Sequence, residues 1–272
     1  MARPDNEQEM LQRFSKKYAL GQADVMMDIE RAVCGCDYGG TSWMTRDEAL
    51  DISIKLELAP GRRLLDMGSG SGWPGLFMAQ QTGCDTTLTD LHHEGLAIAR
   101  ERAAADQIPG QCWSAVADGT ALPFPDSWFD AIHHADVLCC LHEKLAALGE
   151  CRRVIGPGGR MVFTVLLITP DLSAADYELA LASGPEFVAT EAPYVDLLRQ
   201  TGWQLTDHKD LTSEFKKSVR TSGDLEEAHH AEISEIFGEE DAAASLARRR
   251  ATQNGLEHGV LRRELFIAVP VN

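Results

Sequence analysis

The feature that most constrains this chain is its glycine-rich segment, Leu-Leu-Asp-Met-Gly-Ser-Gly-Ser-Gly over residues 64–72. Apolar residues and an acid are followed by alternating glycines, a pattern that predicts a strand turning sharply into a helix. Glycines lack a Cβ atom and let a ligand lie directly on the backbone. The first N–H groups of the next helix also point toward any negative charge on that ligand. The segment therefore predicts a site for a nucleotide-like ligand.

Strand and helix patterns alternate from residue 63 to residue 168, which predicts a parallel sheet with helices on both faces. The predicted strands of this part are Arg63–Met67, Asp85–Thr89, Cys112–Ala117, Phe129–His133 and Arg160–Ile168. Two later strands, Trp203–His208 and Leu265–Pro270, are separated by a long polar helical region. This separation predicts that the last strand pairs antiparallel with its neighbours. The expected fold class is α/β, a doubly wound, mostly parallel seven-stranded sheet with an α-helical cap.

We expect a single domain over residues 1–272. Residues 1–44 are expected to form N-terminal helices and a lid loop, with a capping box at Thr45 and Glu48 starting the next helix. Residues 45–168 are expected to form the ligand-binding core. Residues 169–272 are expected to supply a substrate-side cap and the closing strands.

The formal charge of −17 argues against a nucleic-acid partner, because binding phosphates needs a basic surface stripe. The dense basic run Arg248-Arg249-Arg250 is interpreted as a solvated helix face, with an anion site as the alternative. Lys216, Lys217 and Arg220 are interpreted in the same way, with contact to an acidic substrate group as the alternative. We therefore expect a small-molecule partner, and the sequence predicts no oligomeric state.

Neither the first residues of the sequence, its apolar runs nor its cysteines indicate export, membrane insertion or metal binding. Residues 1–9 are polar and acidic, unlike a secretory signal, and no apolar run approaches the length of a membrane span. The seven scattered cysteines fit reduced thiols, and their spacing matches no zinc site. We expect a cytoplasmic protein with no metal site and no membrane partner.

Three acids lie near the ends of successive predicted strands: Asp66, Asp90 and Asp118. In a doubly wound sheet such strand ends face one crevice in which ligands bind. A carboxylate at Asp90 can accept both hydroxyls of a ribose, and Asp118, followed by Gly119, can accept the exocyclic amine of adenine. These acceptors together predict an adenosine with free hydroxyls.

A dinucleotide site is the alternative, because residues 70–75 satisfy G-x-G-x-x-G and Asp90 follows at the spacing expected of the ribose-binding acid. Two features argue against it. The alternating glycines already begin at Gly68, and Asp118-Gly119 has no role in a dinucleotide fold. A purely structural glycine turn would leave the three strand-end acids unexplained.

At this point the sequence resembles a known family. Residues 64–72, Asp90, the segment Ala117-Asp118-Gly119 and the turn over residues 153–159 are similar to the ordered motifs of class I S-adenosylmethionine-dependent methyltransferases. The resemblance implies a Rossmann-like methyltransferase fold and S-adenosylmethionine as cofactor. The cofactor-binding residues that it implies are Asp66, Gly68, Ser69, Gly70, Gly72, Asp90, Leu91, Asp118, Gly119 and His133.

The loop over residues 35–40 is similar to the segment that precedes the glycine motif in phosphoethanolamine and sarcosine/dimethylglycine methyltransferases. In those enzymes an aromatic residue there covers the methionine end of the cofactor. The resemblance assigns this role to Tyr38, with Trp43 as a neighbour. Other aromatic residues, among them Tyr18, are lid candidates or ordinary packing.

Methyl transfer from a sulfonium is an in-line displacement, so the protein must mainly position and desolvate the nucleophile. A general base helps an alcohol, or an amine that must lose a proton. The candidates are His133 and His134 at the end of the fourth predicted strand, with Asp136 two residues later. His142 follows shortly and is a candidate for lining the pocket. Because strand neighbours point to opposite faces, at most one of the pair is expected to reach the substrate.

The predicted function is methyl transfer from S-adenosylmethionine to a nitrogen or oxygen atom of a small molecule. A nicotinamide-dependent oxidoreductase and a non-catalytic S-adenosylmethionine-binding protein are the alternatives. The second would have no pocket opening toward the sulfonium methyl. The sequence does not identify the acceptor.

Overall fold

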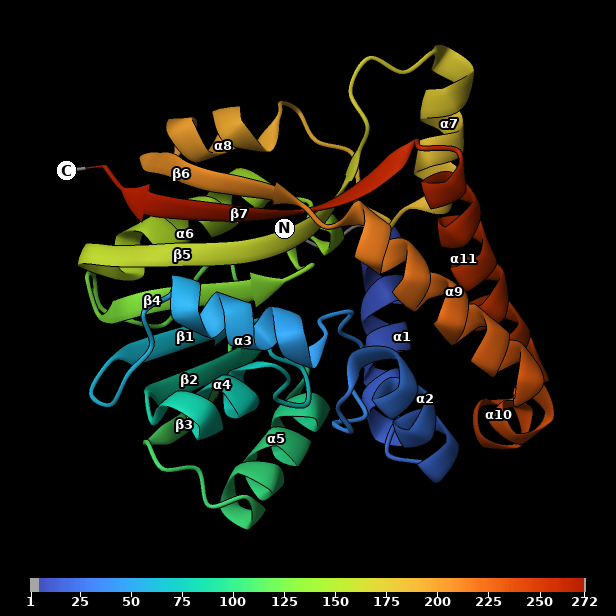
Figure 1. Ribbon diagram of the computed structural model, residues 1–272, viewed down its shortest axis with the longest axis horizontal. Coiled ribbons are helices and arrows are strands. Elements are labelled where there is room, and N and C mark those ends of the chain that lie inside the picture. The colour runs from blue at the N-terminus through green and yellow to red at the C-terminus, as the bar shows by residue number, and fades with distance from the viewer. Residues whose placement is uncertain (1–4, 272) are drawn as a thin grey trace.

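The computed structural model describes residues 5–271, so the first four residues of the polar N-terminal segment lie outside it. Its seven strands form one sheet in the order β3-β2-β1-β4-β5-β7-β6 (Figure 1). Strand β7 pairs antiparallel with β5 and β6, and the other neighbouring pairs are parallel. The predicted mixed sheet and its antiparallel last strand are confirmed. The strands are β1 (Arg63–Met67), β2 (Asp85–Asp90), β3 (Cys112–Val116), β4 (Phe129–Ala135), β5 (Ile155–Ile168), β6 (Trp203–Asp210) and β7 (Leu261–Pro270).

Helices cover both faces of this sheet because its central strands are apolar on both sides. On one face Leu64 and Leu88 pack with residues of α3, α4 and α5, and on the other Leu65 and Phe163 pack with residues of α6 and α8. The helices that pack on the sheet are α3 (Arg46–Lys55), α4 (Gly75–Thr82), α5 (His93–Ala105), α6 (Lys144–Val154) and α8 (Tyr194–Gln200).

The capping box at the start of α3 is present as predicted. The Glu48 backbone N–H donates to Thr45 Oγ1 at 3.2 Å, and the Thr45 N–H donates to Glu48 Oε2 at 2.9 Å. These two hydrogen bonds satisfy backbone donors that the first helical turn leaves without partners.

The remaining helices gather beyond one end of the strands and form a cap (Figure 1). The cap joins the N-terminal helices to the long polar region between β6 and β7, which forms three helices. Its members are α1 (Asp5–Leu20), α2 (Asp24–Cys34), α7 (Ala174–Ser183), α9 (Thr212–Ala228), α10 (His230–Phe237) and α11 (Glu239–Glu257). Segments from the two ends of the sequence therefore enclose one space at the carboxyl ends of the parallel strands.

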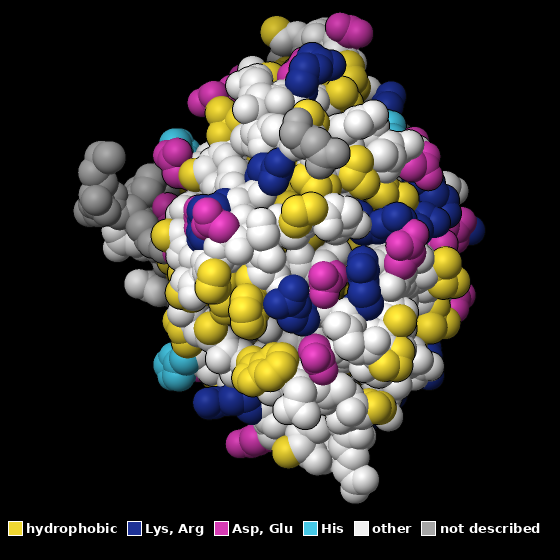
Figure 2. All heavy atoms as spheres, turned by 90° about the vertical axis from the view of Figure 1, so that its left-hand side faces the viewer, with side chains coloured by type: hydrophobic (Ala, Val, Ile, Leu, Met, Phe, Trp, Pro, Cys, Tyr) yellow, Lys and Arg dark blue, Asp and Glu magenta, His cyan; other side chains and the backbone are white. Residues whose placement is uncertain are grey.

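The molecular face turned to the viewer in Figure 2 shows cations, acids and apolar side chains interspersed, so this face carries no basic stripe. None of the helices within residues 5–271 is long and apolar enough to cross a membrane. The described residues also contain no cluster of histidine, cysteine, aspartate or glutamate side chains placed to hold a metal ion.

Candidate functional site

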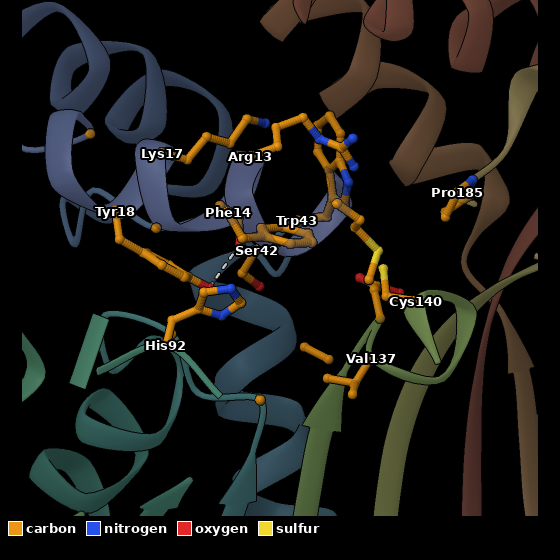
Figure 3. A pocket seen from close by; sticks show the side chains of 18 of the residues that line it. Arg13, Phe14, Lys17, Tyr18, Ser42, Trp43, His92, Val137, Cys140 and Pro185 are labelled. Carbon is orange, nitrogen blue, oxygen red and sulfur yellow. Dashed lines mark hydrogen bonds between the residues drawn. The ribbon is translucent and has the colours of Figure 1, made fainter. Parts of the chain in front are cut away.

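A cavity of about 700 Å³ lies between the carboxyl ends of β1, β2 and β4 and the cap. Residues of α1, α2, α7, α9, α10 and α11 line its other sides. Figure 3 shows Tyr18 and His92 on one side of this cavity and Val137 and Cys140 on the other, with Phe14 and Trp43 between them. The volume falls in the range of about 300–1,000 Å³ that is typical of small-molecule sites.

The predicted glycine turn forms the edge of the cavity after β1. Gly68 and Gly70 adopt φ values of +72° and +51°, which favour glycine. A Cβ atom on Gly68 would lie 2.5 Å from Val137 Cγ2, and one on Gly70 would lie 2.7 Å from the Tyr18 hydroxyl. Ser69 also lines the cavity. The bare backbone of this turn therefore meets side chains from both the end of β4 and α1.

Asp90 ends β2 and lines the cavity beside Leu91. Its Oδ2 accepts the Gly70 N–H at 2.9 Å, and its Oδ1 accepts the His92 N–H, also at 2.9 Å. His92 Nδ1 lies 2.9 Å from the same Oδ1, and His92 Nε2 lies 3.0 Å from the Leu11 carbonyl oxygen. This network links the Asp90 carboxylate to both the glycine turn and α1.

The same network affects the pKa of His92. Burial lowers this pKa, but the hydrogen bond and charge of Asp90 and the Leu11 carbonyl together raise it above its ordinary value. Each ring nitrogen faces an oxygen acceptor, and these two contacts link α1 to the end of β2.

Asp66 is buried at the end of β1, where its Oδ2 accepts the Gly75 N–H at 3.1 Å. Burial raises the pKa of this carboxyl to about 8, although the Gly75 hydrogen bond opposes the shift. Asp66 lines the cavity and also fixes the first turn of α4.

The other predicted cofactor residues divide between the cavity and the structure around it. Gly119 lines the cavity after β3, whereas Asp118 does not. Asp118 Oδ1 accepts hydrogen bonds from the backbone N–H and the hydroxyl of Thr120, at 2.9 and 2.7 Å. Gly72 also lies outside the cavity, because it packs closely against Leu76 and Ala99.

The structure does not bring Tyr38 to the cavity. Its ring lies 3.8 Å from the Arg102 guanidinium and 5.2 Å from the Trp73 ring, in a separate depression. Tyr18 of α1 occupies the position against the glycine turn instead, and Trp43 does line the cavity (Figure 3). The sequence offered Tyr18 as a lid candidate or an ordinary packing residue, but it did not predict this contact with the glycine turn.

His133 and His134 also lie outside the cavity. Strand β4 continues to Ala135, beyond the predicted strand end, so both histidines are within the sheet and have no exposed surface. His133 Nδ1 donates to the Val162 carbonyl at 2.8 Å, and the His134 ring stacks on Phe163 at 4.7 Å. Burial lowers the pKa of His133 to about 4 and that of His134 well below its ordinary value. Their surroundings keep both rings neutral and away from a substrate.

The cavity edge after β4 is formed by Ala135, Asp136 and Val137. Asp136, with a φ of +54°, receives hydrogen bonds at 3.1 and 3.0 Å from Nε of the buried Arg263 on β7. His142, expected as a possible lining residue, lies outside the cavity and is an exposed residue paired with Glu143. Of the described histidines, His92 is the one that lines the cavity.

The basic run on α11 is not wholly the solvated face expected from the sequence. Arg248 and Arg249 line the cavity, whereas Arg250 does not and pairs with Asp224 and Glu227 on α9. Two of the three arginines therefore belong to the site, and one to the outer helix surface.

The sheet order, the glycine turn between β1 and α4, and a cavity at the strand ends define the class I methyltransferase fold, a Rossmann-like architecture. Residues 65–163 match the family model described as "Methyltransferase domain". This part of the chain is a methyltransferase domain, and the whole chain is similar to S-adenosylmethionine-dependent methyltransferases.

The chain spans about two thirds or less of the length of the curated relatives it matches. It is 26% identical to phosphoethanolamine N-methyltransferase 3 of Arabidopsis thaliana, a match covering 72% of this chain and 39% of the relative. It is also 26% identical to (+)-O-methylkolavelool synthase of Herpetosiphon aurantiacus, over 67% of this chain and 65% of the relative.

Solved structures share the fold at lower sequence identity. Phosphoethanolamine N-methyltransferase 2 of Haemonchus contortus, in complex with phosphomonomethylethanolamine and S-adenosylhomocysteine, has a TM-score of 0.73 at 18% identity, covering 92% of this chain and 58% of that one. The [4+2]-cyclase SpnF has a TM-score of 0.77 at 22% identity, covering 100% of this chain and 98% of that one.

Proposed function

We propose that this protein transfers a methyl group from S-adenosylmethionine to a nitrogen or oxygen atom of a small molecule held in the cavity. One observation carries the proposal. The space beside the glycine turn continues past Asp136 and Val137 to the inner faces of α7, α9 and α11. A protein that only bound the cofactor would need no such continuation.

The residues around the glycine turn are suited to holding the cofactor. Asp90 offers carboxylate oxygens to ribose hydroxyls, and the turn over Gly68 to Gly70 offers backbone at close range. Gly119 lies where an adenine would be expected after β3, and Tyr18 covers the turn from the cap. The bound cofactor supplies an electrophilic methyl group on a sulfonium, whose departure leaves a neutral thioether.

The chain itself has to place and desolvate the acceptor. Phe14 and Trp43 supply apolar walls that exclude water, and Asp136 can accept a hydrogen bond from an acceptor amine or hydroxyl. Because Arg263 donates to both Asp136 oxygens, this carboxylate is suited to orienting the acceptor rather than to taking its proton. His133 and His134, buried in the sheet, have no part in this proposal.

A second candidate is a cyclisation without methyl transfer, since the [4+2]-cyclase structure matches this chain along nearly its whole length. The two candidates differ in the mass of the product. Methyl transfer adds one methylene to the mass of the acceptor, whereas a cyclisation leaves the mass unchanged.

The test is calorimetric titration with S-adenosylmethionine, S-adenosylhomocysteine and NAD, followed by incubation of methyl-labelled S-adenosylmethionine with small amines and alcohols. We expect the first two ligands to bind, NAD not to bind, and label to enter an acceptor. Binding of NAD alone would overturn the proposal, and cofactor binding with only unlabelled isomeric products would favour the cyclase.

A further inference from the structure

The cavity wall opposite the cofactor side is cationic. The inner face of α1 contributes Arg13, Lys16 and Lys17, and the inner face of α11 contributes Arg248 and Arg249. Figure 3 shows Arg13 and Lys17 on the upper side of the cavity, across from Val137 and His92 on the lower side. This wall therefore lies across the cavity from the glycine turn.

Three of these five cations have acidic partners. Arg13 pairs with Glu186 at 2.7 Å, Lys16 pairs with Asp241, and Arg249 pairs with Glu226 at 2.7 Å. Each pair joins two different elements of the cap. These three cations therefore hold the cap together.

The side chains of the other two cations, Lys17 and Arg248, form no hydrogen bond or ion pair with residues 6–271, although the charge of Glu226 reaches Lys17 and those of Glu186 and Asp241 reach Arg248. The chain carries 42 acidic against 25 basic side chains, so a shortage of acids does not explain this. Charges in a partly enclosed site normally have a partner or a ligand, because removing them from water is costly.

The surroundings of Lys17 show that the two cations are crowded. Burial lowers the pKa of Lys17 to about 8, with Arg249, Arg248 and Arg13 acting in the same direction and Glu226 against it. Burial lowers the pKa of Arg248 as well, with Arg13 and Arg249 acting in the same direction and Glu186 and Asp241 against it. An anion placed between them would relieve both the repulsion and the loss of hydration.

We propose that Lys17 and Arg248 form a subsite for an anionic group, a carboxylate or a phosphate, on the acceptor molecule. The acceptor then spans the cavity, with its anionic end at α1 and α11 and its reacting atom near Asp136 and Val137. This inference rests on the proposed function and specifies its substrate class. A polyanion such as nucleic acid does not fit, because the subsite is inside a cavity of a protein with a net charge of −17.

The test uses inorganic phosphate and acetate as probes of protein saturated with S-adenosylhomocysteine, with chloride keeping the ionic strength constant. The melting temperature is measured at increasing concentrations of each anion, and a rise that saturates indicates binding to the folded protein. We expect at least one anion to stabilise the wild type, and Lys17→Gln and Arg248→Gln each to weaken its apparent affinity at least tenfold. Comparison of the apparent affinities for phosphate and for acetate identifies which anionic group the subsite prefers.

Arg250→Gln is the matched control, because it removes a cation from the same run on the outer face of α11 and should leave the anion affinity unchanged. Raising the pH above the pKa of Lys17 should weaken anion binding in the wild type but not in Lys17→Gln. Anion binding that is absent from the wild type, or that is equal in all variants, overturns the inference.

A separate titration distinguishes this subsite from one for the cofactor's own carboxylate. Lys17→Gln and Arg248→Gln should bind S-adenosylhomocysteine as the wild type does. A loss of that affinity, with unchanged binding of methylthioadenosine, which lacks the carboxylate, would show that the cations serve the cofactor and overturn the inference. Failure of the wild type to bind S-adenosylhomocysteine would instead refute the proposed function.

Discussion

Replacing Arg263 with methionine should strongly destabilise the fold. This side chain is 1% exposed and joins three elements. Its Nε donates to both carboxylate oxygens of Asp136 after β4, its Nη1 donates to Glu48 of α3 at 2.8 Å, and its Nη2 donates to Thr164 of β5 at 3.3 Å. Methionine keeps the apolar packing but leaves two carboxylates without a cation.

Removing one partner of a buried ion pair costs about 3–5 kcal/mol, because the remaining charge stays desolvated. The side chains of Asp136 and Glu48 are 10% and 16% exposed, so water can compensate only a small part of the loss. For a chain of this length the change corresponds to a fall in melting temperature of roughly 6–10 °C. The added variant Asp136→Asn should recover part of the loss, since it removes one of the uncompensated charges.

Urea unfolding followed by circular dichroism measures the change, with Arg262→Met as the matched control. Arg262 is the neighbouring residue on β7, is 42% exposed, and lies 3.6 Å from Glu264. Because Arg262 itself is exposed and Glu264, though buried, keeps His208 as a second partner, this loss should be only about 0–1 kcal/mol. A loss in Arg263→Met no larger than in Arg262→Met would refute the reasoning, as would a double variant less stable than Arg263→Met alone.

Three further predictions concern one buried histidine of the sheet and two residues of the site. The unfolding free energy should fall as the pH drops from 6.5 toward about 4, because over this range His133 takes up a proton only in the unfolded chain. His133→Gln should reduce the slope of unfolding free energy against pH by up to ~1.4 kcal/mol per pH unit. Equal slopes for the wild type and His133→Gln in urea titrations would contradict the prediction. Tyr18→Ala should weaken the affinity for S-adenosylhomocysteine about tenfold, and Tyr38→Ala should leave this affinity nearly unchanged. A larger loss in Tyr38→Ala than in Tyr18→Ala, measured by calorimetry, would restore Tyr38 to the site. Asp90→Asn should weaken S-adenosylmethionine binding by roughly 1–3 kcal/mol, and unchanged affinity would remove Asp90 from the site.

Features that depend on neighbouring residues in the chain were predictable. The capping box at Thr45 needs only a hydroxyl and a carboxylate one helical turn apart. The glycine turn after β1 needs only residues that tolerate positive φ, and Gly68 and Gly70 supply them. Asp66 and Asp90 were placed at the cavity because parallel strands end at the same edge of a sheet.

Predictions that depended on strand length or loop direction were less successful. Because β4 is longer than predicted and continues to Ala135, His133 and His134 are inside the sheet rather than at its edge. Tyr38 was assigned by resemblance, but its ring packs against Arg102 of α5, which is distant in the sequence. Neither the length of a strand nor the direction of a loop is set by the local sequence, because both depend on which surfaces from distant parts of the chain are available for packing.

The sequence by itself determined the alternation of strands and helices, the glycine turn and the acids at the ends of β1 and β2, since each depends on backbone preference over a few residues. Only the tertiary structure decided what faces the cavity. Arg248, Arg249 and Arg250 are indistinguishable in the sequence, and the helical rotation of about 100° per residue separates them only once α11 is packed against α1 and α9. The same packing brings Lys17 and Arg248, from opposite ends of the chain, to one wall of the site.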